Sequence, residues 1–226
     1  MKNAIYKKVM RVVIAIITAT ALTGASIAMS PSANAYNGSN AASYARNYYQ
    51  KYNPEYNKYS SDCTNFASQA AYAGGEKKTN PTKISTGVTG TSSYWYSYKY
   101  SLTKKILFWT TTKEGWAESS TWVRVAGGQG FYDYFKSRKT LTVTKDYGTI
   151  RANARLGDIV QVMAKGESAK SHSMVVGDLV KAVINGKTGV EVVFYYHTND
   201  TRRTLPDFDN RYGKGTGTNT YTVYKM

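Results

Sequence analysis

The chain has 226 residues with 30 Lys and Arg against 14 Asp and Glu, so its formal charge is +16 at pH 7. It holds one Cys and two His, which excludes a disulfide-stapled scaffold and a zinc finger and leaves little room for an all-histidine metal centre. With 42 % hydrophobic and 14 % aromatic residues, the chain can bury a core, and this composition argues against wholesale disorder.

Residues 1–35 have the pattern of a secretory signal peptide. Four basic residues precede an uncharged apolar stretch at 12–28, and Ala33-Asn34-Ala35 gives a small-x-small cleavage pattern. The alternative is a membrane anchor, but five Thr, Gly and Ser residues dilute this stretch below what a bilayer span requires. We therefore predict secretion and cleavage after Ala35, which leaves one 191-residue domain, residues 36–226, with a charge of +12.

Two helices are predicted at the start of this domain. Residues 41–52 carry Ala and Tyr at helical spacing and end before Pro54. Residues 63–73 follow a cap at Ser61 or Asp62 and end at Gly74-Gly75.

The middle of the chain gives weaker signals. Residues 76–119 show no clear period and are expected to be irregular, and their aromatic segment 94–100 is a candidate lining for a substrate cleft. Residues 122–135 have aromatic residues at helical spacing and predict a third helix, weakened by three glycines.

From residue 140 onward the pattern changes to strands. The expected strands are residues 141–144, 158–163, 173–184, 190–197 and 218–224. Asn185-Gly186 is a two-residue hairpin signal between the third and fourth of them. Helices followed by an antiparallel sheet predict an α+β fold.

The single cysteine occupies a position suited to chemistry. Cys63 opens the predicted second helix, where free backbone N–H groups and the helix dipole stabilise a thiolate and can hold an oxyanion. The alternative is an inert packing cysteine, but its neighbours Asp62, Thr64 and Asn65 are polar. We predict that Cys63 is a nucleophile.

A nucleophilic thiol most often uses a histidine as its base, and the chain offers His172 and His197. If the hairpin loop has two residues, His172 lies opposite Asn199, and His197 lies one diagonal step away on the same face. Either side chain could then orient the imidazole of His172, as in nucleophilic acyl transfer. A one-residue shift would place Asp200 there instead.

Several segments resemble a known family. The block Asp62-Cys63-Thr64-Asn65-Phe66, followed in order by Leu156-Gly157-Asp158, His172-Ser173-Met174 and His197-Thr198-Asn199-Asp200, resembles the amidase domain of secreted bacterial proteins. That family is similar to the CHAP and NlpC-type cell-wall hydrolases.

The resemblance carries expectations about fold and chemistry. It implies a papain-like α+β fold, in which N-terminal helices pack on a small antiparallel sheet, and hydrolysis of amide bonds, typically in peptidoglycan. It implies that Cys63 and His172 are catalytic, with His197 or Asn199 as the third member.

The sequence therefore predicts a secreted cysteine amidase or peptidase that needs no cofactor. Its expected partners are a peptide or amide substrate and the bacterial cell wall or another polyanionic surface. Apart from the positive charge, no motif indicates nucleic-acid binding, so nucleic acid is not an expected partner. No membrane partner is expected after signal cleavage.

Two other readings remain open. Cys63, His172 and His197 could together bind zinc. A chain with 21 Tyr and four Trp could also be a non-catalytic, basic wall-binding module, although core packing explains most aromatic residues equally well. Which amide bond is cut does not follow from the sequence.

Overall fold

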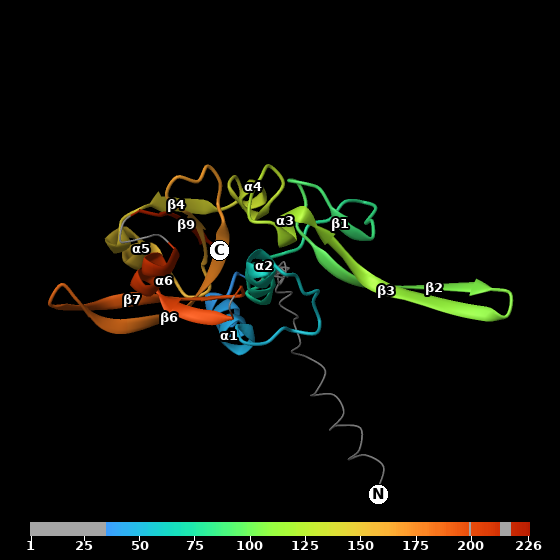
Figure 1. Ribbon diagram of the computed structural model, residues 1–226, viewed down its shortest axis with the longest axis horizontal. Coiled ribbons are helices and arrows are strands. Elements are labelled where there is room, and N and C mark those ends of the chain that lie inside the picture. Colours follow the sequence, from blue (N-terminus) through green and yellow to red (C-terminus); the bar gives the residue numbers. More distant parts are fainter. Residues whose placement is uncertain (1–34, 199, 213–217) are drawn as a thin grey trace, which may run out of the picture. The chain divides into compact units, whose positions relative to one another are not determined.

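A computed structural model describes residues 35–198, 200–212 and 218–226 (Figure 1). The predicted signal peptide, apart from Ala35, and the candidate residue Asn199 lie outside the described residues. The described part belongs to one compact unit and has an α+β fold, with six helices and two sheets. None of its helices is both long enough and apolar enough to cross a membrane.

Two helices begin the domain. Helix α1 (Gly38–Tyr48) starts three residues before its predicted position, because the side chain of Asn37 accepts a hydrogen bond from the Asn40 N–H. Helix α2 (Cys63–Ala73) has the predicted bounds. It ends where Gly75 takes a φ of 102°, a conformation that favours glycine.

A six-stranded sheet lies at the centre of the fold. Its order is β4 (Thr140–Thr144), β9 (Thr220–Lys225), β5 (Ile159–Met163), β6 (His172–Ile184), β7 (Lys187–Tyr196) and β8 (Thr201–Thr204). All neighbouring strands are antiparallel, which confirms the predicted antiparallel sheet.

Each face of this sheet packs against its own set of helices. On one face, Phe66 and Ala70 of α2 pack against Val175 of β6 and Tyr195 of β7. On the other face lies a second cluster that includes Met174, with α5 (Tyr147–Asn153) and α6 (Leu205–Tyr212) contributing buried residues. Because side chains alternate along a strand, Val175 belongs to one core and its neighbours Met174 and Val176 belong to the other.

The prediction for residues 76–119 is wrong. This segment contains β1 (Gly87–Thr89) and a long hairpin formed by β2 (Ser97–Ile106) and β3 (Trp109–Ser119), which make a second, three-stranded sheet. The outer half of the hairpin is exposed on both faces, so its sequence lacks the alternation by which a half-buried strand is recognised. Trp95 and Tyr96 are fully buried and do not line a cleft.

The predicted helix at 122–135 is also wrong, since the segment holds two short helices. These are α3 (Ser120–Val123) and α4 (Phe131–Phe135). Gly127 and Gly128 between them have φ values of 95° and 83°, which no α-helix accommodates. Helices α5 and α6 were not predicted, because each is only seven or eight residues long.

Candidate functional site

Cys63 is the first residue of α2 and is 5 % exposed. It lines a pocket of about 390 Å³ whose other walls come from the segment between α3 and α4 and from the residues just before β6. The pocket is lined by Ser61, Cys63, residues 123–127 and residues 169–171. A thiol at a helix N-terminus therefore faces a space that can receive a small chemical group.

The environment of the thiol combines burial with hydrogen bonding. Burial raises the pKa of Cys63, while a backbone hydrogen bond with Ser173 and the neighbouring Thr64 act in the opposite direction by smaller amounts. The Cys63 sulfur lies 3.8 Å from the Thr64 hydroxyl oxygen. The resting state is therefore a thiol, and the groups around it favour the thiolate once the proton leaves.

A buried polar network extends from this site into the sheet. The hydroxyl oxygens of Thr64 and Ser173 lie 2.9 Å apart, and the side-chain amide of Gln161 donates to Ser173 at 2.9 Å. The Tyr224 hydroxyl in turn donates to Gln161 at 2.5 Å. Sequence reasoning missed this network; its signal was one polar residue in an apolar stretch of each of two strands, Gln161 in β5 and Ser173 in β6.

The structure does not bring His172 to Cys63. His172 pairs with Val162 of β5, and its ring contacts Tyr196, Phe208 and Tyr212 in the core under α6. Cys63 belongs to α2, which covers the opposite face. The neighbouring Ser173 is the residue of β6 that points toward α2, since successive side chains of a strand alternate.

His172 is held in its neutral form. Burial among aromatic rings lowers the pKa of its imidazole to about 4. Its Nε2 atom is buried and has no hydrogen-bond partner among the described residues. A buried nitrogen without a hydrogen-bond partner is costly in an apolar core. His172 and Cys63 therefore have separate surroundings, the first in the core under α6 and the second at the start of α2.

The predicted hairpin register is right near the turn and wrong farther along. Ile184 pairs with Lys187, as expected for a two-residue loop, but a bulge between Val176 and Asp178 shifts the register by one residue. A one-residue shift moves side chains to the other face. His197 therefore lies on the face of α2, and the predicted contact of His197 with His172 is not formed.

Glycine permits this bulge at position 177. A Cβ atom on Gly177 would lie 2.1 Å from the ring of Tyr195. The bulged segment is held by Arg46 of α1, which donates to the Gly177 carbonyl at 2.6 Å and pairs with Asp178 at 3.1 Å.

His197 joins the two N-terminal helices. Its Nδ1 lies 2.5 Å from a carboxylate oxygen of Asp62, and its Nε2 lies 2.8 Å from the carbonyl oxygen of Tyr48. The ring also stacks on Phe66, with centroids 4.2 Å apart. Both ring nitrogens are occupied, so His197 positions Asp62, the residue before Cys63, without contacting the thiol through a free nitrogen.

Of the two predicted caps, Ser61 and Asp62, the structure has Asp62 at the N-cap position, but its side chain does not cap the helix. The carboxylate instead accepts from the Tyr59 N–H at 3.0 Å and from the Asn65 side chain at 2.8 Å, in addition to its contact with His197. The loop before Cys63 is thereby fixed to the helix that Cys63 begins.

Two cationic side chains line the Cys63 pocket. These are Arg124 and Lys170, and sequence reasoning singled out neither. Burial lowers the pKa of Lys170 to about 8. Its ammonium lies 2.5 Å from the Thr222 hydroxyl and 4.6 Å from the ring centre of Tyr132. Lys170 therefore lines the pocket of Cys63 and has a pKa closer to neutrality than an exposed lysine, while its ammonium contacts two residues that do not line this pocket.

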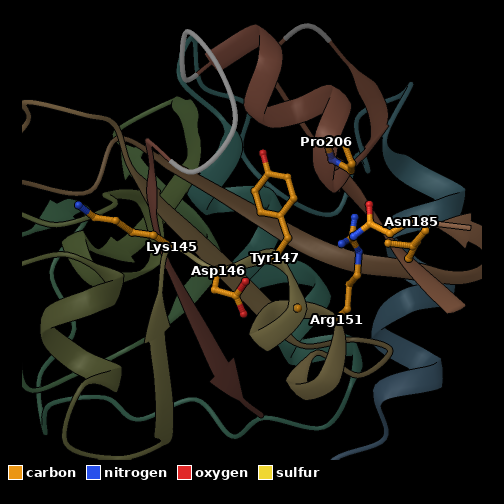
Figure 2. A pocket seen from close by; sticks show the side chains of 8 residues that line it. Lys145, Asp146, Tyr147, Arg151, Asn185 and Pro206 are labelled. Atoms are coloured by element: carbon orange, nitrogen blue, oxygen red, sulfur yellow. The ribbon is translucent and has the colours of Figure 1, made fainter. Parts of the chain in front are cut away.

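A larger pocket lies elsewhere. It has a volume of about 710 Å³. Its lining comes from the α5 segment, from Asn185 in the β6–β7 turn and from Pro206 of α6 (Figure 2). Two of its three charged residues have structural partners, since Arg151 pairs with Glu191 at 2.6 Å and Asp146 caps α5. Neither Cys63 nor a histidine lines it, so we place the candidate site at the smaller pocket.

The zinc reading requires Cys63, His172 and His197 in one place. Within the ranges that the structure describes, no three His, Cys, Asp or Glu side chains form a group that could hold a metal ion. The three residues have separate surroundings: a pocket, an aromatic core and a helix junction.

Comparison with known proteins places the chain in a family. Residues 35–224 match the model of a family described as "Putative amidase domain". No curated protein and no solved structure matches the chain. The matched range includes Cys63, both histidines and Lys170.

Proposed function

Because the chain belongs to this amidase-domain family, we propose that it is a secreted, cysteine-dependent amidase or peptidase that hydrolyses amide bonds in bacterial peptidoglycan. One observation carries the cysteine mechanism: Cys63 is the first residue of α2 and lines a pocket with two cationic side chains. A thiol in that position has both a substrate space and groups that stabilise its anion.

In the proposed reaction, the Cys63 thiolate attacks the amide carbonyl. Backbone N–H groups at the start of α2 stabilise the oxyanion. The tetrahedral intermediate expels the amine, which takes up a proton, and leaves a thioester on Cys63. Water then attacks the thioester, releases the acid and restores the thiol.

Sequence and structure differ on which residue accepts the proton of the Cys63 thiol. The sequence and the family resemblance favour His172, which the structure locates in the opposite core. We propose Lys170 instead, because it lines the pocket of Cys63 and burial lowers its pKa to about 8. Transfer of the proton would require the ammonium end of Lys170 to move from Thr222 toward the thiol, and the resulting ammonium and thiolate would stabilise each other.

The papain-like arrangement is part of the proposal. Its support is that α2, which begins with the cysteine, packs on an antiparallel sheet through Phe66 and Val175. His172, which this arrangement expects on the same face, instead packs against Phe208, and the neighbouring Ser173 faces α2.

The cell wall is the proposed site of action. The exported domain carries a charge of +12, which attracts it to anionic wall polymers. Arg124 and Lys170 in the pocket would favour a substrate that carries a carboxylate near the scissile amide, as peptide stems do.

The test is to incubate the mature protein with purified peptidoglycan and identify the released fragments by mass spectrometry. The wild type should release fragments with a new amine and a new carboxylate, and Cys63→Ala should release none above background. Ser61→Ala, which alters an exposed residue of the same pocket, should behave as the wild type.

The same experiment distinguishes the competing readings. Wall binding without fragment release would favour the non-catalytic binding module. Full activity in Cys63→Ala would overturn the cysteine mechanism.

A further inference from the structure

The far end of the β2–β3 hairpin presents three large apolar side chains to solvent. Leu107, Phe108 and Trp109 are consecutive and are 81 %, 96 % and 72 % exposed. Figure 1 shows this end of the hairpin extending away from the helices and the six-stranded sheet of the described unit. We call these three residues the hairpin apex. Three adjacent, nearly fully exposed apolar side chains indicate an interaction surface.

The turn at the apex uses residues that an ordinary hairpin avoids. Ile106 pairs with Trp109, so Leu107 and Phe108 form a two-residue loop, and Leu107 has a φ of 51°. The β6–β7 hairpin has a loop of the same length but uses Asn185 and Gly186, which tolerate positive φ. Leucine is disfavoured in this conformation, so the apex retains apolar side chains where the backbone favours glycine or asparagine.

Positive charge surrounds the apex. Lys104, Lys105 and Lys113 are exposed on the two strands that lead to it. Along the outer part of the hairpin the one acidic side chain is Glu114, which lies 3.9 Å from Lys99. Among the described residues, Lys104, Lys105 and Lys113 form no ion pair and are available to an anionic partner.

We propose that the hairpin apex inserts into the surface of a lipid bilayer that contains anionic headgroups. Tryptophan and other large apolar side chains partition to the membrane interface, while flanking lysines bind anionic headgroups. A sugar polymer would use flat aromatic faces and gain little from Leu107. A soluble polyanion would use the lysines and gain nothing from the apolar apex.

This inference is independent of the chemistry proposed for Cys63. It also differs from the sequence-based expectation that the exported chain has no membrane partner. The difference arises because residues 76–119 were expected to be irregular, so the sequence did not predict an exposed apolar hairpin end.

The test uses the mature protein and vesicles of phosphatidylcholine with or without phosphatidylglycerol. Wild-type protein should sediment with the anionic vesicles, less so at high salt, and its tryptophan emission should shift to the blue. Trp109 is the one exposed tryptophan of the described chain, so this shift reports on the apex.

Two apex variants and one control complete the experiment. Phe108→Asp should weaken vesicle binding about tenfold or more, because it removes apolar area that enters the interface. Lys104→Gln combined with Lys105→Gln should weaken binding to anionic vesicles and reduce its dependence on salt. The control is Val183→Asp, which changes an apolar residue that is 76 % exposed on the other hairpin, β6–β7. This variant should bind vesicles as the wild type does.

Three results would overturn the proposal. The wild type could fail to bind anionic vesicles while binding wall polymer, or Phe108→Asp could bind them undiminished. Phe108→Asp could instead abolish self-association of the wild type in sedimentation velocity with no effect on vesicles, which would assign the apex to a second copy. Each variant should still cleave soluble peptidoglycan fragments, so failure here is separable from failure of the proposed hydrolase function.

Discussion

The two faces of the six-stranded sheet hold one histidine each, and the two residues have opposite surroundings. On the face of α2, His197 makes hydrogen bonds through both nitrogens, to Asp62 and to the Tyr48 carbonyl. On the face of α5 and α6, His172 lies among aromatic rings, and its Nε2 has no partner among the described residues. Strand alternation and one bulge therefore determine which of the two histidines lies on the same face as Cys63.

The comparison predicts that His197 matters more for stability than His172. His197→Phe should lower the free energy of unfolding by about 3–5 kcal/mol, because it removes the imidazole partner of the buried Asp62 carboxylate and leaves it only two neutral hydrogen-bond donors. His172→Phe should cost less than about 1 kcal/mol at pH 7, since phenylalanine suits an aromatic core and removes an unpaired nitrogen. Urea unfolding of both variants measures this difference, and equal losses would contradict it.

The two histidines should also differ in their effect on acid stability. The unfolded imidazole has a pKa near 6.5, whereas burial lowers the pKa of His172 to about 4 in the folded state. Between these values the unfolded chain binds a proton that the folded chain does not, so stability falls as pH drops from 6.5 to 4. The loss is on the order of 3 kcal/mol.

His172→Phe should remove this part of the pH dependence. Chemical denaturation at a series of pH values compares the variant with the wild type. A wild-type curve and a His172→Phe curve that remain parallel from pH 6.5 to 4 would show that His172 does not titrate as the structure indicates.

A third prediction concerns catalysis on the α2 face. Lys170→Met should lower kcat/KM for amide hydrolysis by about 100-fold, because it removes the proposed proton acceptor from the Cys63 pocket. In the wild type, kcat/KM should rise as the pH increases toward the Lys170 pKa of about 8, and Lys170→Met should remove this rise. His172→Phe is the matched variant on the other face and should retain most activity; the reverse pattern would restore His172 as the base.

The smallest effect should come from the bulge that separates the faces. Gly177→Ala adds a Cβ that would lie 2.1 Å from the Tyr195 ring, so it should cost about 1–3 kcal/mol of stability. Gly189→Ala is a suitable control in β7, where the added Cβ would approach a flexible Ile184 side chain at 3.2 Å. If both substitutions have equal effects in thermal unfolding, the bulge does not require glycine.

Local signals in the sequence predicted part of this fold well. The bounds of α2 follow from Asp62 and from the Gly74-Gly75 pair, and the β6–β7 turn follows from Asn185-Gly186. Both features depend on nearby residues. The β2–β3 hairpin was missed because an exposed strand shows no apolar alternation, and α5 and α6 were missed because short helices are stabilised by tertiary packing.

The candidate site could be predicted only in part for a related reason. The position of Cys63 at a helix N-terminus is local, and the structure has it there. The face of His172 depends on how its strand packs against α2, and the position of His197 depends on a bulge at Gly177. Lys170 lines the pocket because the fold brings the segment before β6 close to the start of α2, and no sequence motif includes it.

The most direct test uses the fact that the chain has one thiol. Partial alkylation with iodoacetamide, followed by intact mass, gives the fraction of Cys63 modified, and the same samples are assayed for release of peptidoglycan fragments. The account predicts that activity falls in direct proportion to the alkylated fraction and reaches zero at complete modification. Fully alkylated protein that still hydrolyses peptidoglycan would contradict it.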